Sequence, residues 1–349
     1  MAISPFSQPS SRLPVFAGRG SLRRMNYRLQ IALASCLVSL FAFGCATNKD
    51  TPIKPLTPQE QEAFFSRAQD ERRFWLTRYE SDRGPVFTGG HRLHTDKFAY
   101  AEFVNARRSD LPAITVRLRS QQEYLALLDT SSAASWIEFG VAASEGVIPI
   151  GPPPLRLYAG HVGDPIPGFF SALPRLVIDQ LHVDTALIYV KAAHGPLQSL
   201  TRNQDELRIP IVLGGEFIRA FHYVQFHFPS RQVLFSTTTA YQPDPDRLLA
   251  TLPMQDYYGM IVVTGNIDGE ETPLLLDSVG AFAVASDFGL GDTARQVMIG
   301  DLVLRNVAHT AIEETDLGIP NMPRIGRAIL DRLVVTFDGR NRRVYFERP

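Results

Sequence analysis

The stretch Leu127-Leu128-Asp129-Thr130-Ser131-Ser132 ends an apolar run at a carboxylate and continues with a hydroxyl and small residues. The same pattern returns in the second half of the chain as Leu274-Leu275-Leu276-Asp277-Ser278-Val279-Gly280. One aspartate in a turn is ordinarily structural, because its side chain accepts hydrogen bonds from nearby backbone N–H groups. Two aspartates at the same point of a repeated pattern indicate instead a duplicated unit whose two turns meet at a pseudo-two-fold axis.

Other segments repeat around the two acidic turns in the same order, which supports an internal duplication. Each copy has a strand before the turn, then a hairpin, an apolar-Gly segment that leads into a short helix, and a final hairpin. In order, these segments are 114–118, 176–183, 211–219 and 231–235 in the first copy, and 260–263, 297–304, 324–330 and 343–346 in the second. Apolar and polar residues alternate along 114–119, as in strands with one buried face. We therefore predict a mainly β fold with two pseudo-symmetric β-barrel lobes and an N-terminal helix.

Composition divides the chain into four predicted segments. They are a signal peptide of the lipoprotein type at 1–44, a tether and N-terminal helix at 45–96, a first lobe at 97–240 and a second lobe at 241–349. The capping pattern Thr57-Pro58-Gln59-Glu60 predicts a helix start, and we expect that helix to run to about Glu80. The segment 84–95, with two adjacent glycines, is predicted to be a loop.

The two copies differ in length after the acidic turn. Ile178 follows Asp129 by 49 positions, whereas Ile299 follows Asp277 by 22, so the first copy holds 27 additional residues. These residues fall around 151–154 and 158–170, which are rich in Gly and Pro. An insertion in one lobe only is either a lid over a cleft or a surface excursion without a role.

The first 44 residues have the features of a targeting segment rather than of a folded domain. They contain five arginines, no lysine and no acid, and the uncharged apolar run 31–43 is too short to span a bilayer comfortably. The run ends at Ala42-Phe43-Gly44-Cys45, which resembles the lipobox of bacterial lipoproteins. The resemblance implies lipidation of Cys45 and anchoring in the cell envelope, at the periplasmic side of the outer membrane.

The lipobox resemblance is incomplete at two positions. The family prefers Leu where this chain has Ala42, and a small residue where it has Phe43. An ordinary signal peptide or a membrane anchor is the alternative interpretation, and either Met1 or Met25 is the start. Cys36 lies inside the apolar run, so a chain cleaved before Cys45 holds a single cysteine and no disulfide.

The two acidic turns resemble the active-site motifs of aspartic proteases of the pepsin and retroviral type. That motif is apolar-apolar-Asp-Thr/Ser-Gly, followed in each lobe by apolar-apolar-Gly before a short helix. The matching segments are Asp129-Thr130, Asp277-Ser278, Val212-Leu213-Gly214 and Ile325-Gly326-Arg327. The resemblance covers about 97–349. It implies that Asp129 and Asp277 share one proton and activate a water against a peptide bond, without metal or cofactor. It also implies that Thr130 and Ser278 support the dyad through hydrogen bonds between the lobes.

The third motif position departs from the family, since Ser131 and Val279 stand where both lobes normally have Gly. Val is poorly tolerated there if the backbone needs a positive φ. The second hypothesis is therefore a catalytically inactive, protease-like lipoprotein that binds a peptide or a protein partner in the cleft between the lobes.

The charge of the chain and the placement of its histidines and serines argue against nucleic-acid binding, metal binding and serine catalysis. The whole chain has a net charge of −1, and removal of the five N-terminal arginines leaves −6 on the rest, which gives no electrostatic footprint for nucleic acid. The eight histidines form no metal-binding pattern. No Gly-x-Ser-x-Gly motif accompanies the serines near Asp129, so a serine nucleophile is disfavoured. We expect a monomeric body whose partners are a peptide or protein and, through the N-terminal lipid, a membrane.

Overall fold

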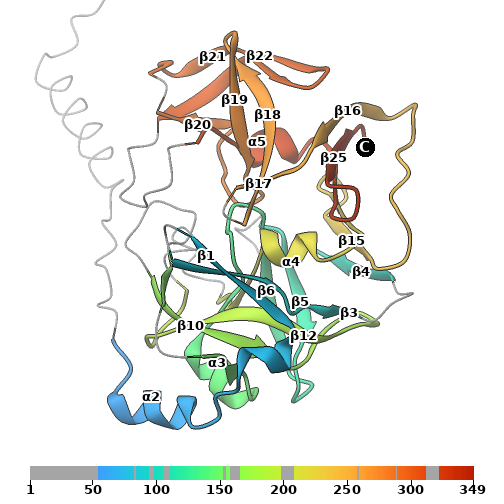
Figure 1. Ribbon diagram of the computed structural model, residues 1–349. Helices are drawn as coiled ribbons and strands as arrows, with labels where there is room; N and C mark the ends of the chain where they lie inside the picture. The colour runs from blue at the N-terminus through green and yellow to red at the C-terminus, as the bar shows by residue number, and fades with distance from the viewer. Residues whose placement is uncertain are drawn as a thin grey trace, which may run out of the picture. The chain divides into compact units, whose positions relative to one another are not determined.

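The computed structural model describes residues 54–349 except for short gaps at 82–83, 94–97, 105–110, 152–154, 158–165, 198–207, 258, 288 and 312–321. Strands hold 51% of the residues and helices 11%, and the strands close two six-stranded β-barrels (Figure 1). The predicted mainly β, two-barrel fold class is therefore confirmed. Residues 53–349 form one compact unit, whereas the predicted signal peptide and Cys45 lie outside the described residues.

Six strands close the first barrel in the hydrogen-bonded order β11-β5-β6-β13-β7-β12, and β12 returns to β11. Their bounds are β5 Ala113–Arg117, β6 Glu123–Asp129, β7 Trp136–Ile137, β11 Leu176–Ile178, β12 Leu181–Lys191 and β13 Ile211–Gly214. β6 pairs with β13 in parallel, β13 with β7 antiparallel, and β7 with β12 in parallel. The acidic turn thus follows directly from a strand in the middle of the barrel wall.

The second barrel repeats this arrangement strand for strand, in the order β21-β18-β19-β23-β20-β22 with β22 returning to β21. Its strands are β18 Met260–Ile267, β19 Glu270–Leu276, β20 Val284–Ser286, β21 Thr293–Ile299, β22 Leu302–Ala311 and β23 Arg324–Ile325. The parallel and antiparallel pairings occur at the same places as in the first barrel. Two halves with one topology are what a duplicated unit produces, as the repeated segments predicted.

The final hairpins of the two halves join in a six-stranded sheet of order β16-β25-β24-β14-β15-β4. Its strands are β4 Phe98–Glu102, β14 Tyr223–His227, β15 Gln232–Ser236, β16 Leu248–Pro253, β24 Val334–Asp338 and β25 Arg343–Glu347. β14 of the first half pairs antiparallel with β24 of the second at the centre of this sheet. The rings of Phe226 and Phe337 meet across the pair with centroids 5.5 Å apart. One apolar core, which includes Leu128, Leu276 and Phe337, extends through both halves.

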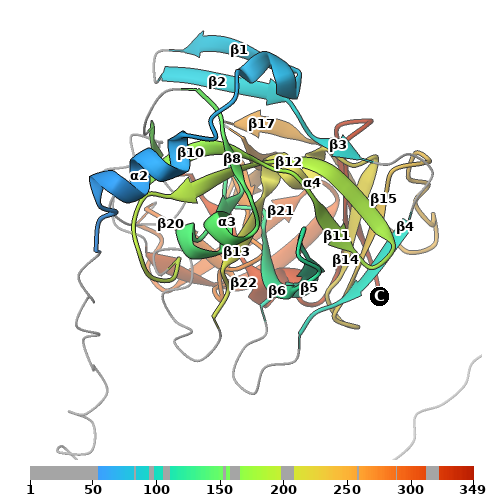
Figure 2. The same cartoon turned by 90° about the horizontal axis from the view of Figure 1, so that it is seen from below.

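The N-terminal segment differs from its prediction beyond the first turns of its helix. The predicted capping box is present at Thr57 and Glu60, but helix α2 covers only Pro58–Phe65. A 3₁₀ turn follows at Glu71–Phe74. Trp75 then has a φ of 58°, in the left-handed region, where a right-handed helix cannot continue. Strand β1 (Leu76–Ser81) pairs with β2 (Gly84–Gly89), so the predictions of a helix to Glu80 and a loop at 84–95 are wrong (Figure 2). The short strand β3 (Arg92–Leu93) adds to β12.

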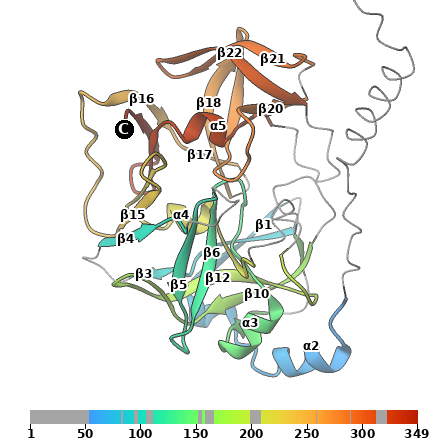
Figure 3. The same ribbon diagram turned by 180° about the vertical axis from the view of Figure 1, so that it is seen from behind.

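The insertion in the first half has secondary structure of its own. It contains strand β9 (Leu155–Leu157) and the start of β10 (Ile166–Leu173), and helix α3 (Phe139–Ser144) and strand β8 (Ile148–Pro149) come just before it. β10 lies beside β12 and extends the barrel sheet (Figure 3). Residues 152–154 and 158–165, on which the lid hypothesis depends, lie outside the described residues. Among the described residues, no helix is long and apolar enough to cross a membrane.

Candidate active site

Asp129, the last residue of β6, is fully buried and caps its own turn. Its Oδ1 accepts hydrogen bonds from the backbone N–H of Ser131 at 2.9 Å and of Ser132 at 3.1 Å. The Ser131 hydroxyl donates a third bond to the same oxygen at 2.7 Å. These bonds fix the carboxyl group at the end of the strand.

Asp277 has the same place in the second barrel, directly after β19, and is also fully buried. Its Oδ1 accepts from the N–H of Val279 at 2.9 Å and of Gly280 at 2.7 Å. The two turns therefore hold their carboxyl groups in the same way, with one difference. The second turn has no hydroxyl at the position of Ser131, because Val279 stands there.

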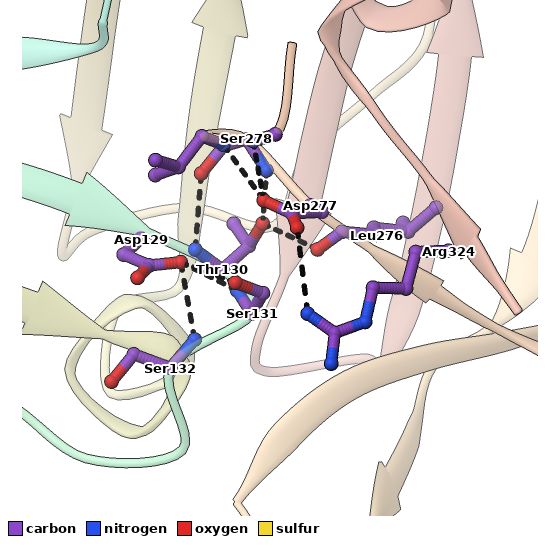
Figure 4. Close-up of polar contacts among 10 residues, drawn as sticks. Asp129, Thr130, Ser131, Ser132, Leu276, Asp277, Ser278 and Arg324 are labelled. Atoms are coloured by element: carbon purple, nitrogen blue, oxygen red, sulfur yellow. Dashed lines mark hydrogen bonds and ion pairs between the residues drawn. The ribbon is translucent and has the colours of Figure 1, made fainter. Parts of the chain in front are cut away.

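Thr130 and Ser278 connect the two turns through a reciprocal set of hydrogen bonds (Figure 4). The Thr130 hydroxyl donates to the carbonyl oxygen of Leu276 at 2.6 Å and accepts from the Ser278 N–H at 3.0 Å. The Ser278 hydroxyl donates to the carbonyl oxygen of Leu128 at 2.8 Å and accepts from the Thr130 N–H at 3.0 Å. Each hydroxyl thus bonds to the residues on both sides of the opposite aspartate. The structure brings the two acidic turns of this chain together, through the two hydroxyl residues named from the sequence.

The apolar-Gly segments pass close behind each turn, and this contact requires glycine. A Cβ atom at Gly214 would lie 2.5 Å from the carbonyl oxygen of Ala134, and one at Gly326 would lie 2.4 Å from that of Phe282. The following N–H groups then bond to the turns, Gly215 to the Ser132 carbonyl and Arg327 to the Gly280 carbonyl, both at 2.8 Å. The short helices α4 (Gly215–Arg219) and α5 (Arg327–Leu330) begin at these points.

The third motif position does not need glycine here. Neither Ser131 nor Val279 has a positive φ, so neither residue is strained by its side chain. Val279 is half-buried and packs against an apolar cluster of the first lobe that includes Leu127, Trp136 and Val212. The Val279 side chain therefore adds to the contact between the lobes next to the two acidic turns.

Arg324 is the functional candidate that the sequence reading did not single out. Its Nη1 lies 3.9 Å from Asp277 Oδ2, and its side chain is only 12% exposed (Figure 4). Leu275 stands opposite Arg324 in the β19–β23 pair, as Leu127 stands opposite Val212 in β6–β13. Arg324 is thus the counterpart of Val212. The signal was present in the sequence, because a charged residue interrupts an apolar-Gly motif that is fully apolar in the first copy.

The Arg324 charge is large on the scale of the other interactions in the site. Opposite unit charges about 4 Å apart attract by roughly 4 kcal/mol at an effective dielectric constant of about 20. One neutral hydrogen bond contributes about 1 kcal/mol net. Part of the Coulomb attraction offsets the desolvation of the two ions. The contact with the guanidinium adds to the interactions that hold the Asp277 side chain in place.

The apolar clusters next to the two acidic turns differ in kind between the lobes. On the first-lobe side, the Trp136 ring packs against Tyr189 with centroids 5.6 Å apart, and Phe170 packs on Tyr189 at 5.1 Å. Burial raises the pKa of Tyr189, and the charge of Glu216 raises it further, so this hydroxyl stays neutral. On the second-lobe side, the buried cluster holds Met260, Val262, Leu275 and Met322.

The chemistry available at the site is that of carboxyl groups and hydroxyls. In the part of the chain that the structure describes, no three His, Cys, Asp or Glu side chains are grouped to hold a metal ion. His309 does contact a hydroxyl, since its Nε2 lies 2.8 Å from Ser286 Oγ. That serine is fully buried within the second barrel, which leaves no room for a substrate beside it. The two acidic turns therefore remain the candidate site. The sequence matches none of the protein-family models and none of the curated proteins with which it was compared.

Proposed function

We propose that the chain is an aspartic peptidase that hydrolyses peptide bonds with a water activated between Asp129 and Asp277. The supporting observation is the reciprocal hydrogen bonding of Thr130 and Ser278, which holds two matched acidic turns together across the lobes. A structural role for one aspartate requires only its own turn. A second turn with the same geometry, bonded to the first, is the arrangement that lets two carboxyl groups act on one water.

In this mechanism the dyad holds one proton and one negative charge. The ionised carboxylate removes a proton from water as the oxygen attacks the carbonyl carbon, and the protonated acid gives its proton to the carbonyl oxygen. The resulting tetrahedral diol collapses when the first acid, the carboxyl group that took the proton from water, protonates the amide nitrogen and the C–N bond breaks. The second acid then recovers a proton from a diol hydroxyl, so the dyad returns to its starting state.

The test is cleavage of casein or a fluorogenic peptide library by the full-length chain in detergent at pH 4–7. We expect cleavage that pepstatin inhibits. Asp129→Asn and Asp277→Asn each should lower kcat by about a thousandfold, because each removes a group that moves a proton. The exposed Asp301→Asn is the matched acid-to-amide control and should keep the wild-type rate. Equal cleavage by the dyad variants would contradict the proposal.

A catalytically inactive, protease-like protein that binds a peptide or protein partner is the second candidate. Two observations favour it: both carboxyl groups are fully buried, and Val279 packs between the lobes beside them. An active enzyme needs an opening step before a substrate reaches the dyad. Binding of casein peptides in the absence of cleavage, at the same affinity for the Asp277→Asn variant, would select this candidate.

We further propose that Cys45 carries a lipid that anchors the chain in the cell envelope, at the periplasmic side of the outer membrane. The support is the basic segment, the apolar run and the Ala42-Phe43-Gly44-Cys45 sequence. The Cys45→Ser variant should lose incorporation of labelled palmitate and move to the aqueous phase in a detergent partition. Cys36→Ser is the matched control and should keep the label; loss of the label in both variants would contradict the assignment.

A further inference from the structure

Trp75 is the most exposed large apolar side chain in the described part of the chain, at 71%. Its backbone also has a φ of 58°, a left-handed conformation that bulky residues rarely adopt and that glycine adopts without strain. Neither burial of the indole nor the fit of the backbone therefore accounts for a tryptophan at this position. An exposed indole on a strained backbone points to a contact outside the chain.

Three arginines lie around this indole. Residues three apart in a 3₁₀ turn lie above one another, so Arg72 and Trp75 share one side of the turn, whereas Phe74 packs into the apolar cluster of the first lobe. Arg73 is exposed next to them. Arg92 of β3 is also exposed, and its guanidinium carbon lies 5.2 Å from the centre of the Trp75 ring. We call Arg72, Arg73, Trp75 and Arg92 the Trp75 patch.

The chemistry of the Trp75 patch fits a lipid surface. The acids of the same turn are Asp70, whose Oδ1 accepts the Arg72 N–H at 2.8 Å, and the half-buried Glu71. The chain after residue 44 carries a net charge of −6, so three exposed arginines around one indole are a local feature. Guanidinium groups attract anionic phospholipid headgroups, and tryptophan side chains favour the boundary between water and lipid.

The length of the N-terminal segment lets the Trp75 patch reach a membrane in which Cys45 is anchored. Nine residues lead from Cys45 to Lys54, and they span at most about 30 Å. The Lys54 carbonyl oxygen accepts the His194 N–H at 2.9 Å, just beyond the end of β12, and β3 pairs with β12 at Thr185. These two points on the chain are nine residues apart, which is at most about 30 Å along a strand. The tether is therefore long enough for the lipid and the patch to lie on one surface.

We propose that the Trp75 patch is a second membrane contact, which docks the first lobe on anionic phospholipid headgroups. This inference rests on the proposed anchoring through Cys45 and is independent of the peptidase function. A single acyl chain holds a protein on a membrane only reversibly, whereas one chain together with a basic patch holds it stably. Docking also turns the side of the body that carries β3 and the 3₁₀ turn toward the lipid.

The first experiment measures the fluorescence of Trp75 in the full-length chain, mixed with vesicles of phosphatidylcholine and phosphatidylglycerol. We expect the emission to shift to shorter wavelength and to be quenched about twofold by brominated acyl chains, because the indole enters the lipid boundary. In Trp75→Phe the remaining Trp136, which is 1% exposed inside the first barrel, is the control and should change in neither respect. Unquenched Trp75 emission, whether or not the chain floats with the vesicles, would overturn the proposal.

The second experiment separates docking from lipidation, because it uses the full-length Cys45→Ser chain. Its partition into the same vesicles should fall about fivefold for Arg72→Gln and for Arg73→Gln, since each substitution removes one charge that faces an anionic surface. On vesicles of phosphatidylcholine alone these two substitutions should have no effect. Arg295→Gln removes an equal charge from a side chain that is 83% exposed on β21 and is the matched control. Equal partition of all these variants would refute docking, whether or not Cys45 carries a lipid.

The Trp75→Gly substitution separates a role in docking from a role in folding. Glycine fits the left-handed backbone at this position, so the urea midpoint should not fall. The partition of the same variant into the anionic vesicles should fall about tenfold, because the indole is lost. A lower urea midpoint together with an unchanged partition would assign Trp75 to the fold alone and overturn the proposal.

Discussion

At the two acidic turns, each of two hydroxyl side chains forms a clamp, a pair of hydrogen bonds between the lobes. Thr130 and Ser278 each donate one hydrogen bond and accept another, and all four bonds connect residues that are fully buried. Buried polar groups that lose a partner cost more than the bond itself contributed, because water cannot replace it. The position of the two carboxyl groups therefore depends on the hydroxyl side chains of the residues that follow them.

The Thr130→Val substitution tests this clamp, because Val has the same shape and no hydroxyl. It leaves the Leu276 carbonyl and the Ser278 N–H without their partner, so we expect a loss of about 2–4 kcal/mol in the free energy of unfolding. Thr130→Ser keeps the hydroxyl and should cost less than about 1.5 kcal/mol. Urea denaturation measures both variants. If Val and Ser destabilise the chain equally, the hydroxyl bonds are not what holds the turns.

The sequence identified most of this site at the residue scale. Asp129, Asp277, Thr130 and Ser278 are all in the two turns that the structure brings together. Their catalytic and supporting roles remain predictions. Arg324 was missed because a residue's position in a motif gives its backbone place, but the direction of a long side chain depends on packing around it.

At the scale of elements, the acidic turns are held from behind by short helices that start at glycine. α4 and α5 are too short to be stable alone, so their position depends on the backbone contacts of Gly214 and Gly326 with the turns. These elements were predictable, because apolar-apolar-Gly before a helix is a local pattern. Strand β1, which replaces the second part of the helix predicted to reach Glu80, was not predictable. It is set by its pairing with β2, which no residue within 57–80 specifies.

Replacement of either buried glycine by alanine tests the dependence of the turns on close backbone packing. Gly214→Ala and Gly326→Ala each place a Cβ atom within 2.5 Å of a backbone oxygen. The strand or turn must shift, so we expect a loss of about 2–4 kcal/mol in unfolding free energy for each variant. Gly140→Ala in α3 is the matched control, since its Cβ meets nothing within 4 Å and Ala favours a helix by about 1 kcal/mol. Urea midpoints give the comparison, and a neutral Gly214→Ala variant would contradict the packing argument.

At the scale of the whole molecule, the central sheet ties the halves into one cooperative structure. β14 and β24 pair at its centre, and the apolar core is continuous through both halves. The segment between β15 and β16 is also attached to this sheet, because the hydroxyl of Tyr241 donates to Glu347 on β25. The duplication and both barrels followed from sequence repetition. The central sheet could not be predicted in this way, because the sequence of one copy does not indicate that its final hairpin pairs with that of the other copy.

The substitution Phe337→Ala tests whether the two halves unfold together. It removes a buried ring of the second half that contacts Phe226 of the first, and we expect a loss of about 3–5 kcal/mol. The fluorescence of Trp136, in the first barrel, should shift its urea midpoint as much as far-ultraviolet circular dichroism does. A Trp75→Phe background removes the exposed second tryptophan. Val303→Ala, at a side chain 42% exposed on β22, is the control and should change the free energy by no more than about 0.5 kcal/mol. Separate midpoints for the two signals would mean independent halves.

The difference between Val212 and Arg324 has a consequence for how such a molecule can arise. A protein assembled from two identical chains around the same axis would have to carry an arginine next to both acids or next to neither. Once both copies are encoded in one polypeptide, each can mutate alone, and a lone cation beside one acid becomes accessible to selection. A single chain that carries both halves can therefore differ between its two acidic turns, which a symmetric dimer of one half cannot do.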